Sequence, residues 1–429
     1  MKRTAGRWAL GLTLSALHVW SASAQEPPSL KAELLDVADP SLGHGAQLNT
    51  NWMYPLATLV GIELSTQPLG TSSGGFTFSF DKTLGITVRS SHSFGPAFSE
   101  RAVTVGRSKF SLGFNYLHAS YNSLGGLNLR NGDLKTFVSN GRGAPAITQD
   151  VRLNLVSDTA VVFGGVGVGD GVDLGFAVPL ISVTMSGQAD TFSTPGIGSE
   201  PYPPDVRSIP LDPVPFGDPR NRRQATSAGL GDITLSAKFR LLRIEEGGLA
   251  INTELHLPTG DADNFRGLGI TRPSVSAIWS RGGTVAPHAN LGYEFWSSGI
   301  SMTKPCVPGN GFDCATEKRL EAKDVIKYAI GIEASPSPKG TVVIDVVGRT
   351  VRHGGKIGYA DVSGLRDLFS LDGGVSTLSV VPGLKWNPTA TLLLSANVLV
   401  PLNVQKVLPS LSEGLRTGLV PVVGVEWAF

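Results

Sequence analysis

The sequence has little charge, few aromatic residues and almost no cysteine. Only 17% of its 429 residues are charged, and the net charge is +1. A near-neutral chain sets up no strong field for a polyanion, so no nucleic-acid partner is expected. Aromatic residues make up 7%, which is modest for a membrane barrel with two aromatic girdles.

Long apolar runs are also missing. The best candidates for a transmembrane helix after residue 25 are 174–189 and 389–400, and both are too short or too rich in Gly, Ser and Thr. Hydrophobic residues nevertheless make up 41% and are evenly spread, which excludes a disordered chain. Only helices and closed barrels satisfy every backbone polar group in lipid. The chain is therefore either a soluble exported protein or a β-barrel.

Export is indicated by the first residues. A basic start with Lys2 and Arg3 precedes an apolar stretch, 8–20, and the small residues Ala22-Ser23-Ala24. This is the pattern of a cleaved secretory signal. Residues 1–24 are expected to be the signal peptide. An uncleaved anchor is the alternative, but its apolar run is shorter than the roughly 20 residues that a span needs.

Many segments alternate between apolar and polar or small residues. Leu112, Phe114 and Tyr116 alternate with Ser111, Gly113 and Asn115, for example. A period of two predicts strands with one apolar and one polar face. No comparable stretch has the pattern of an amphipathic helix, so the fold class is all-β. The predicted strands are 74–90, 107–121, 149–166, 171–187, 229–243, 247–258, 268–281, 284–299, 323–335, 339–352, 375–386, 389–402 and 415–429, with a weaker segment at 57–65.

The lengths of the connections alternate between short and long. Short ones are expected at 167–171, 245–248, 282–283, 335–338 and 387–388, and long ones at 122–148, 188–228, 259–267, 300–322, 353–374 and 403–414. Outer-membrane barrels have short periplasmic turns and long external loops, whereas a soluble sandwich has no reason to sort loops by parity.

The alternation of short and long connections also predicts the topology. The last strand must end in the periplasm, so segment 74–90 runs downward and needs an upward strand before it. Residues 57–65 supply that strand and give an antiparallel up-and-down barrel of about 14 strands over residues 57–429. A barrel of about 12 strands is the alternative. Residues 25–56 are left over as an N-terminal extension or a plug in the lumen, and Trp52, Met53 and Tyr54 are its candidate plug residues because they are apolar.

The C-terminus carries a second signal. The last strand alternates and ends in Trp427-Ala428-Phe429. This resembles the assembly signal that the barrel-insertion machinery reads in bacterial outer-membrane proteins. The expected location is therefore the outer membrane of a Gram-negative cell.

Two cysteines, Cys306 and Cys314, fall in one predicted external loop. An exported loop is in an oxidising compartment, so a disulfide between them is expected. No His lies near them, so neither a metal nor a cofactor is expected. Another external loop, 188–228, is rich in Pro and Arg, and it either folds inward as a lid or lies in solvent with its arginines against lipopolysaccharide phosphates.

Prolines inside predicted strands mark bulges or edges. They are Pro179, Pro273, Pro287, Pro382 and Pro421. Catalysis is not expected. His288 and Asn290 lie two residues apart on one strand face with Ser297 following, but polar lumenal residues explain them better than a nucleophile and its base.

Residues 64–121 carry a family resemblance. The segments Gly74-Gly75-Phe76-Thr77-Phe78, Phe94-Gly95-Pro96-Ala97-Phe98-Ser99-Glu100-Arg101 and Gly113-Phe114-Asn115-Tyr116 resemble an outer-membrane transporter family named for the meta-pathway of phenol degradation. That family is similar to the fatty-acid transporters of the outer membrane. The resemblance implies a barrel with an N-terminal hatch in its lumen and a lateral exit for hydrophobic ligands.

The Phe94–Arg101 motif falls in the first predicted periplasmic connection. Phe94, Gly95 and Pro96 shape a candidate turn there, and Glu100 and Arg101 could close the barrel base by an ion pair or lie in solvent.

These observations lead to three hypotheses. The first is passive uptake of small hydrophobic or aromatic compounds through an outer-membrane channel. The second is a general or solute-specific porin, and the third is a structural or adhesin-type surface barrel. An apolar pocket in the lumen would favour uptake, and rings of Arg opposite Asp or Glu would favour a porin. The expected partners are outer-membrane lipid and lipopolysaccharide, the barrel-assembly machinery and a small hydrophobic ligand.

Overall fold

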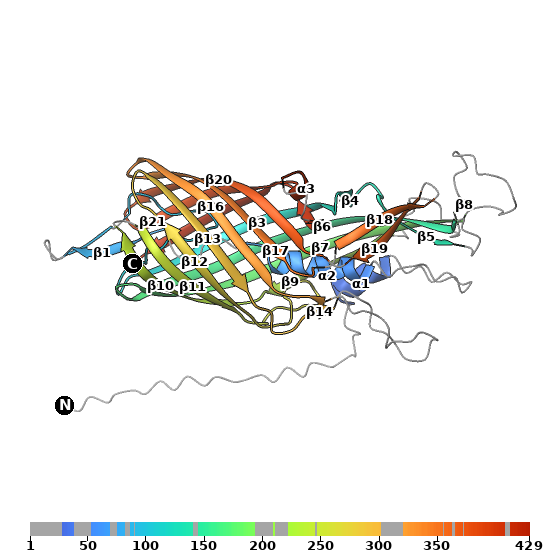
Figure 1. The fold of residues 1–429 in the computed structure, drawn as a ribbon, viewed down its shortest axis with the longest axis horizontal. Coiled ribbons are helices and arrows are strands. Elements are labelled where there is room, and N and C mark those ends of the chain that lie inside the picture. The colour runs from blue at the N-terminus through green and yellow to red at the C-terminus, as the bar shows by residue number, and fades with distance from the viewer. Residues whose placement is uncertain are drawn as a thin grey trace, which may run out of the picture.

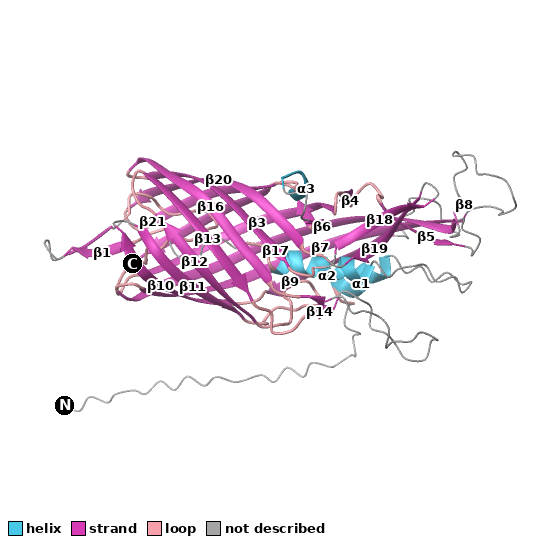
Figure 2. Ribbon diagram, viewed as in Figure 1, coloured by secondary structure: helices cyan, strands magenta, loops and turns pink. Residues whose placement is uncertain are grey.

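A computed structural model describes residues 28–37, 53–68, 75–81, 86–89, 91–139, 145–193, 209–210, 222–244, 247–301, 321–354, 356–362, 365–371, 373–407 and 412–429. The chain forms a closed antiparallel β-barrel whose wall has 12 strands (Figures 1 and 2). In chain order these are β3 (Phe110–Leu124), β6 (Pro145–Gly169), β7 (Val172–Ser193), β10 (Thr234–Ile244), β11 (Gly247–His256), β12 (Arg272–Ser280), β13 (Val285–Glu294), β16 (Val325–Ser337), β17 (Gly340–Val351), β20 (Val375–Thr389), β21 (Leu392–Pro401) and β24 (Val420–Ala428).

The barrel closes where its first and last wall strands meet. β24 pairs with β3 in an antiparallel register from Val422 opposite Leu117 to Ala428 opposite Ser111. The terminal residue extends this seam, because the backbone N–H of Phe429 donates to the carbonyl of Phe110 at 2.8 Å. Their rings stack with centroids 6.0 Å apart.

The remaining short strands lie beyond the wall or at its ends. They are β1 (Phe78–Asp81), β2 (Ile86–Arg89), β4 (Leu127–Asn128), β5 (Leu134–Ser139), β8 (Ile209–Pro210), β9 (Arg222–Leu230), β14 (Ile300–Ser301), β15 (Glu321–Ala322), β18 (Lys356–Val362), β19 (Leu365–Leu371), β22 (Ser412–Glu413) and β23 (Leu415–Thr417). The helices are α1 (Leu30–Val37), α2 (Met53–Ser65) and α3 (Val404–Val407). None of the helices in this described part of the chain has the length and apolarity to cross a membrane.

The sorting of connections by length is confirmed. Turns of a few residues join β6 to β7, β10 to β11, β12 to β13, β16 to β17 and β20 to β21, all at the end that carries the C-terminus (Figure 1). Every connection at the other end is long. By the rule for outer-membrane barrels, the C-terminal end faces the periplasm and the other end faces outward.

Two predicted wall strands are wrong. Residues 57–65 belong to helix α2, and the segment 74–90 holds two short strands, β1 and β2, that pair only with each other. The wall therefore begins at Phe110. The barrel has the 12 strands of the alternative prediction, not about 14.

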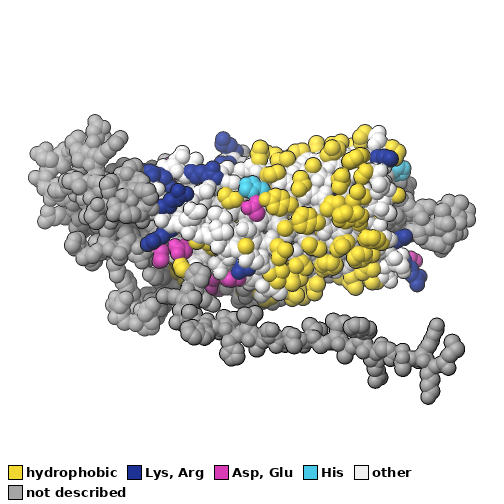
Figure 3. All heavy atoms as spheres, turned by 180° about the vertical axis from the view of Figure 1, so that it is seen from behind, with side chains coloured by type: hydrophobic (Ala, Val, Ile, Leu, Met, Phe, Trp, Pro, Cys, Tyr) yellow, Lys and Arg dark blue, Asp and Glu magenta, His cyan; other side chains and the backbone are white. Residues whose placement is uncertain are grey.

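Within the membrane zone the outward residues of the wall strands are mainly apolar, and many of the inward ones are polar or charged. On β17, Val342 and Ile344 are 44% and 49% exposed, whereas Thr341 and Asp345 are fully buried. On the face seen in Figure 3 the outward residues form a broad apolar band, the apolar belt, across the barrel. This belt is the surface that a lipid bilayer requires, and it places the chain in the outer membrane.

Three tryptophans lie at the periplasmic edge of that belt. Trp279, Trp386 and Trp427 lie near the periplasmic ends of their strands and are 42 to 51% exposed. Phe110 and Phe429 lie at the same level. A low aromatic content is thus enough for a girdle at the periplasmic interface.

Candidate functional site

The lumen holds a cavity of about 290 Å³. The end of helix α2, with Thr66, Gln67 and Pro68, lines it on the outer side. On the periplasmic side it is lined by Phe98, Ser99 and Glu100, which belong to a segment of irregular chain, residues 91–106, that lies inside the barrel. We call residues 91–106 the lumenal segment.

Helix α2 forms the roof of the cavity. It is apolar around its whole circumference, and its residues from Pro55 to Leu64 are buried, as expected for a helix enclosed by protein. The wall holds its C-terminal end through two arginines. Arg272 donates to the carbonyl of Ser65 at 3.4 Å, and Arg349 pairs with Glu63. Cations at a helix C-terminus also interact favourably with the helix dipole.

The candidate plug residues belong to the other end of this helix. Met53 is 1% exposed in the first turn of α2, and Lys31 of α1 lies over the ring of Tyr54 with its Nζ 5.7 Å from the centroid. Trp52 lies outside the described residues. The cavity is lined by the opposite end of α2, so blocking of the lumen by Met53 and Tyr54 themselves remains a proposal.

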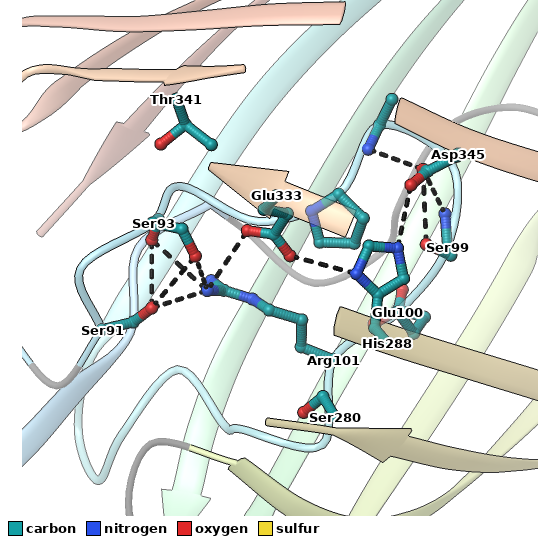
Figure 4. A network of polar contacts seen from close by, with 12 residues as sticks. Ser91, Ser93, Ser99, Glu100, Arg101, Ser280, His288, Glu333, Thr341 and Asp345 are labelled. Atoms are coloured by element: carbon teal, nitrogen blue, oxygen red, sulfur yellow. Dashed lines mark hydrogen bonds and ion pairs between the residues drawn. The ribbon is translucent and has the colours of Figure 1, made fainter. Parts of the chain in front are cut away.

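The lumenal segment forms the floor, and Asp345 of β17 is its main anchor (Figure 4). One carboxylate oxygen, Oδ2, accepts hydrogen bonds from the backbone N–H groups of Ala97 and Phe98 at 3.0 Å and of Ser99 at 3.4 Å. Hydrogen bonds from N–H groups to a carboxylate are charge-assisted and stronger than neutral ones. The other oxygen, Oδ1, lies 2.8 Å from Nε2 of His288.

Glu100 and Arg101 do not pair with each other. Glu100 accepts from Nζ of Lys238 on β10 at 2.7 Å. Arg101 points the other way, with its Nη1 3.8 Å from Glu333 of β16 and 2.7 Å from the hydroxyl of Ser91 (Figure 4). The two charges thus fix the lumenal segment to two parts of the wall.

The placement of this motif in a periplasmic turn is wrong. Lys385 of β20 donates to the carbonyls of Phe94 and Pro96 at 3.2 and 2.6 Å, and Phe94 is fully buried. Gly95 between them has a φ of +82°, where a glycine is favoured. The motif therefore lies inside the barrel, because the polar lumenal face of the wall supplies partners for its backbone groups.

The lumenal position of His288 and Asn290 is confirmed. Asn290 bonds both backbone groups of Glu100, at 2.8 Å to its N–H and 3.0 Å to its carbonyl. Ser297 lies beyond the end of β13, and its backbone N–H donates to Thr271. The three residues are therefore not assembled into a catalytic group.

The side walls of the cavity differ in polarity. One side, from β6 and β7, is apolar and includes Val161, Phe163, Ala177 and Ile181. The other side, from β10 to β17, is charged and carries Asp232, Glu254, His256, Arg272, Glu294 and Lys327. β6 and β16 lie on opposite sides of the ring of strands, so a ligand in the cavity touches both surfaces.

The charged residues of this side pair with one another. Arg272 lies 3.1 Å from Asp232 and 3.1 Å from Glu294. Lys327 lies 2.7 Å from Glu294 and 3.5 Å from Glu254. The charges form a ladder between neighbouring strands of one wall, which differs from a porin ring in which opposite signs face each other across an open pore.

The wall is interrupted beside the cavity. β7 pairs with β9 as far as Leu180 opposite Leu230, and pairing resumes on β10 with Ala177 opposite Thr234. Pro179 lies at this break and has no backbone N–H to donate, although its carbonyl accepts from Gly231 at 2.9 Å. The other four predicted strand prolines also lie within strands, at Pro273, Pro287, Pro382 and Pro421.

An external loop, residues 257–271, covers this break. Arg266 reaches the carbonyl of Leu230 at 3.4 Å and pairs with Asp261 at 3.0 Å. Hydrogen bonds from Asn264 to its carboxylate, and secondarily the Arg266 guanidinium, hold the pKa of Asp261 below its ordinary value. Ala177, Pro179, Asp232 and Arg266 line the cavity, so the cavity extends to the interruption in the wall.

One protein family matches part of the chain. The family described as "Putative MetA-pathway of phenol degradation" matches residues 135–299. This range does not overlap residues 64–121, so the resemblance to that family is confirmed by a second part of the chain. No curated protein matches the sequence.

Solved structures of outer-membrane barrels are similar over most of the chain. An outer-membrane channel of Pseudomonas putida F1 is 14% identical, covers 75% of this chain and 96% of its own, and has a TM-score of 0.43. The toluene transporter TbuX of Ralstonia pickettii is 11% identical, with coverages of 76% and 90% and a TM-score of 0.33. The toluene transporter TodX of P. putida is 7% identical, with coverages of 75% and 89% and a TM-score of 0.30.

Proposed function

We propose that this barrel is a channel for the passive uptake of small hydrophobic or aromatic compounds across the outer membrane. The observation that carries the proposal is the cavity, which lies inside the barrel between α2 and the lumenal segment and has one apolar side. Burial of apolar ligand surface there is favoured by about 25 cal/mol per Å².

The polar side limits which compounds fit. Its two cations, Arg272 and Lys327, are already paired with carboxylates of the same wall, so neither is free to bind an anionic ligand. A neutral compound with an apolar body matches both sides. The interrupted wall next to Pro179 supports an exit toward the bilayer, since the cavity extends to it and, among the described residues, the loop 257–271 lies against it.

Filling the cavity tests this function. Ala177 faces the lumen and is 8% exposed, while Ala160 on the neighbouring strand faces outward. We expect Ala177→Trp to lower toluene uptake several-fold in cells that carry this barrel in place of the chromosomal copy, because the new ring occupies the cavity. Ala160→Trp adds the same side chain to the lipid face and should leave uptake unchanged.

A solute-specific porin is the second candidate, favoured by the charged side of the lumen. Planar-bilayer recordings separate the two. Uptake of apolar compounds predicts little steady ion conductance by the native protein. A steady conductance of porin size, together with equal toluene uptake by both Trp variants, would support the porin and overturn the first proposal.

A further inference from the structure

We propose that the outer surface of the sheet β3–β6–β7–β9, just beyond the apolar belt, is a binding site for the phosphate groups of lipopolysaccharide, the phosphorylated glycolipid of the outer leaflet. Figure 3 shows Lys and Arg side chains beyond the external edge of the belt. The inference concerns the outside of the barrel and does not depend on what the lumen transports.

The level of the membrane surface can be followed along two strands. The outward side chains of β3 change from Leu112 and Phe114 to His118 and Ser120 toward the outer end. On β7 they change from Leu180 to Ser182, Thr184 and Gln188. The apolar layer ends where these polar residues begin, and the head groups of the outer leaflet lie beside them.

Three arginines lie farther out along this polar stretch, two of them, Arg152 and Arg222, in register with Gln188. Arg130 is exposed after β4, and its guanidinium donates to the hydroxyl of Ser120 at 2.6 Å. Arg152 of β6 lies beside the same turn, since a Cβ atom built on Gly132 would be 3.5 Å from its Nε. Arg222 of β9 is exposed and pairs in register with Gln188 of β7.

The spacing fits a head group with more than one phosphate. β9 and β6 are both neighbours of β7, and strands lie about 4.8 Å apart. Arg152 and Arg222 thus start roughly 10 Å apart on either side of Gln188, with Arg130 beyond Arg152. Guanidinium groups bind phosphate oxygens through paired N–H donors.

The acidic groups around these arginines are occupied. Asp190 pairs with Arg152 at 3.2 Å, and Asp150 pairs with Lys135 at 3.3 Å. Asp158 accepts from Tyr116 at 2.6 Å and lies 2.7 Å from Nδ1 of His118. Within the described structure, neither Arg130 nor Arg222 has a carboxylate partner. Their charges are therefore available to an external anion.

The inner face of the same sheet packs against helix α1. Leu153, Val183 and Met185 are fully buried in the cluster that includes Leu34 and Val37 of α1. Because helix α1 packs against the inner face, the sheet is supported from inside the barrel, and its outer face with the arginines is held in a fixed position. This face continues outward from the apolar belt, so a glycolipid with its acyl chains on the belt would extend its phosphorylated sugars along the face toward the arginines.

The test uses the full-length protein purified in detergent and mixed with purified lipopolysaccharide, with bound glycolipid measured by native mass spectrometry. We expect Arg130→Gln/Arg222→Gln to lower bound lipopolysaccharide about tenfold, equivalent to roughly 1.4 kcal/mol. Arg281→Gln/Lys339→Gln removes the same charge from exposed positions at the periplasmic turns and should bind as the native protein does.

Two further measurements complete the test. Lipopolysaccharide whose phosphates have been removed enzymatically should bind the native protein as weakly as the Arg130/Arg222 variant binds the intact lipid. Resistance of the unboiled barrel to unfolding in detergent gels confirms that each variant is folded. The proposal would be overturned if both double variants bound lipopolysaccharide equally, or if removal of the phosphates left binding to the native protein unchanged.

Discussion

Asp345 of β17 holds Ala97 of the lumenal segment through a hydrogen bond of 3.0 Å from the backbone N–H of Ala97 to Oδ2 of Asp345. The same oxygen also accepts from the next two backbone N–H groups. One side chain of the wall therefore fixes three consecutive residues that cross the lumen. Removal of this carboxylate is the most direct way to loosen the floor of the cavity.

We expect Asp345→Leu to increase ion conductance through the barrel. Each hydrogen bond to a charged group contributes about 1.5–3 kcal/mol, so the lumenal segment should leave its position part of the time. Planar-bilayer recordings of the purified variant measure this. Asp170→Asn in the exposed β6–β7 turn is the control, and an unchanged conductance for Asp345→Leu would show that the segment is held by other contacts.

Arg349 should control the docking of α2. Arg349→Met removes the partner of the buried Glu63, and breaking a buried pair in this way costs about 3–5 kcal/mol. Hydrogen exchange followed by mass spectrometry should show faster exchange of peptides within 53–65, with no change in β11 to β13. Combining Arg349→Met with Glu63→Leu should restore part of the protection, because no charge is then left unpaired. Faster exchange of the whole barrel would point to misfolding instead.

Deletion of Phe429 should lower the amount of barrel in the outer membrane far more than its synthesis. The deletion removes both backbone hydrogen bonds with Phe110 and the ring that stacks on it. Phe429→Trp keeps an aromatic ring and should insert nearly normally. Immunoblots of membrane fractions against total protein give the ratio, and normal insertion of the truncated chain would refute a role of this residue in assembly.

Acidification should free the loop over the wall break only well below neutral pH. The depressed pKa of Asp261 means that its contribution to stability is complete above the ordinary aspartate pKa and is lost as the pH falls through the lower folded value. A spin label attached at position 263 of this loop, where Asp263 is exposed, should therefore keep the same mobility from pH 7 to about pH 5. Asp261→Asn should raise the mobility already at pH 7, and equal spectra for both proteins would remove this loop from the mechanism.

Cys306 and Cys314 remain predicted to form a disulfide, and they lie outside the described residues. The bond would close a short loop at a small cost in chain entropy. Mass spectrometry of non-reduced peptides should find the two linked. Recovery of both as free thiols would disprove the pairing.

The sequence was most informative where structure depends on local pattern. Alternation of Leu112, Phe114 and Tyr116 with smaller residues predicts β3, because a strand that separates lipid from lumen must alternate. The prediction of a strand at 57–65 is wrong because a short apolar run is compatible with either a strand or a buried helix. The apolar residues of α2 cover all sides of a helix buried by the barrel.

The floor of the cavity could not be predicted in the same way. Ala97 and Asp345 are 248 residues apart in sequence, and no local pattern links a wall residue to a segment inside the ring. The motif 94–101 stands out through the family resemblance, which does not show that it lies inside the ring. Its partners Lys238 and Lys385 carry no local pattern that marks them as such.

The lumenal segment also constrains assembly. Helix α2 binds Arg349 near the outer mouth, whereas Gly75 donates to Glu426 of the last strand at 2.8 Å and β1 lies at the periplasmic end. The ring of strands is thus threaded by its own N-terminal chain. Because the pairing of β24 with β3 closes the ring, the closed barrel encircles this chain, which ion pairs, hydrogen bonds and apolar packing hold inside it.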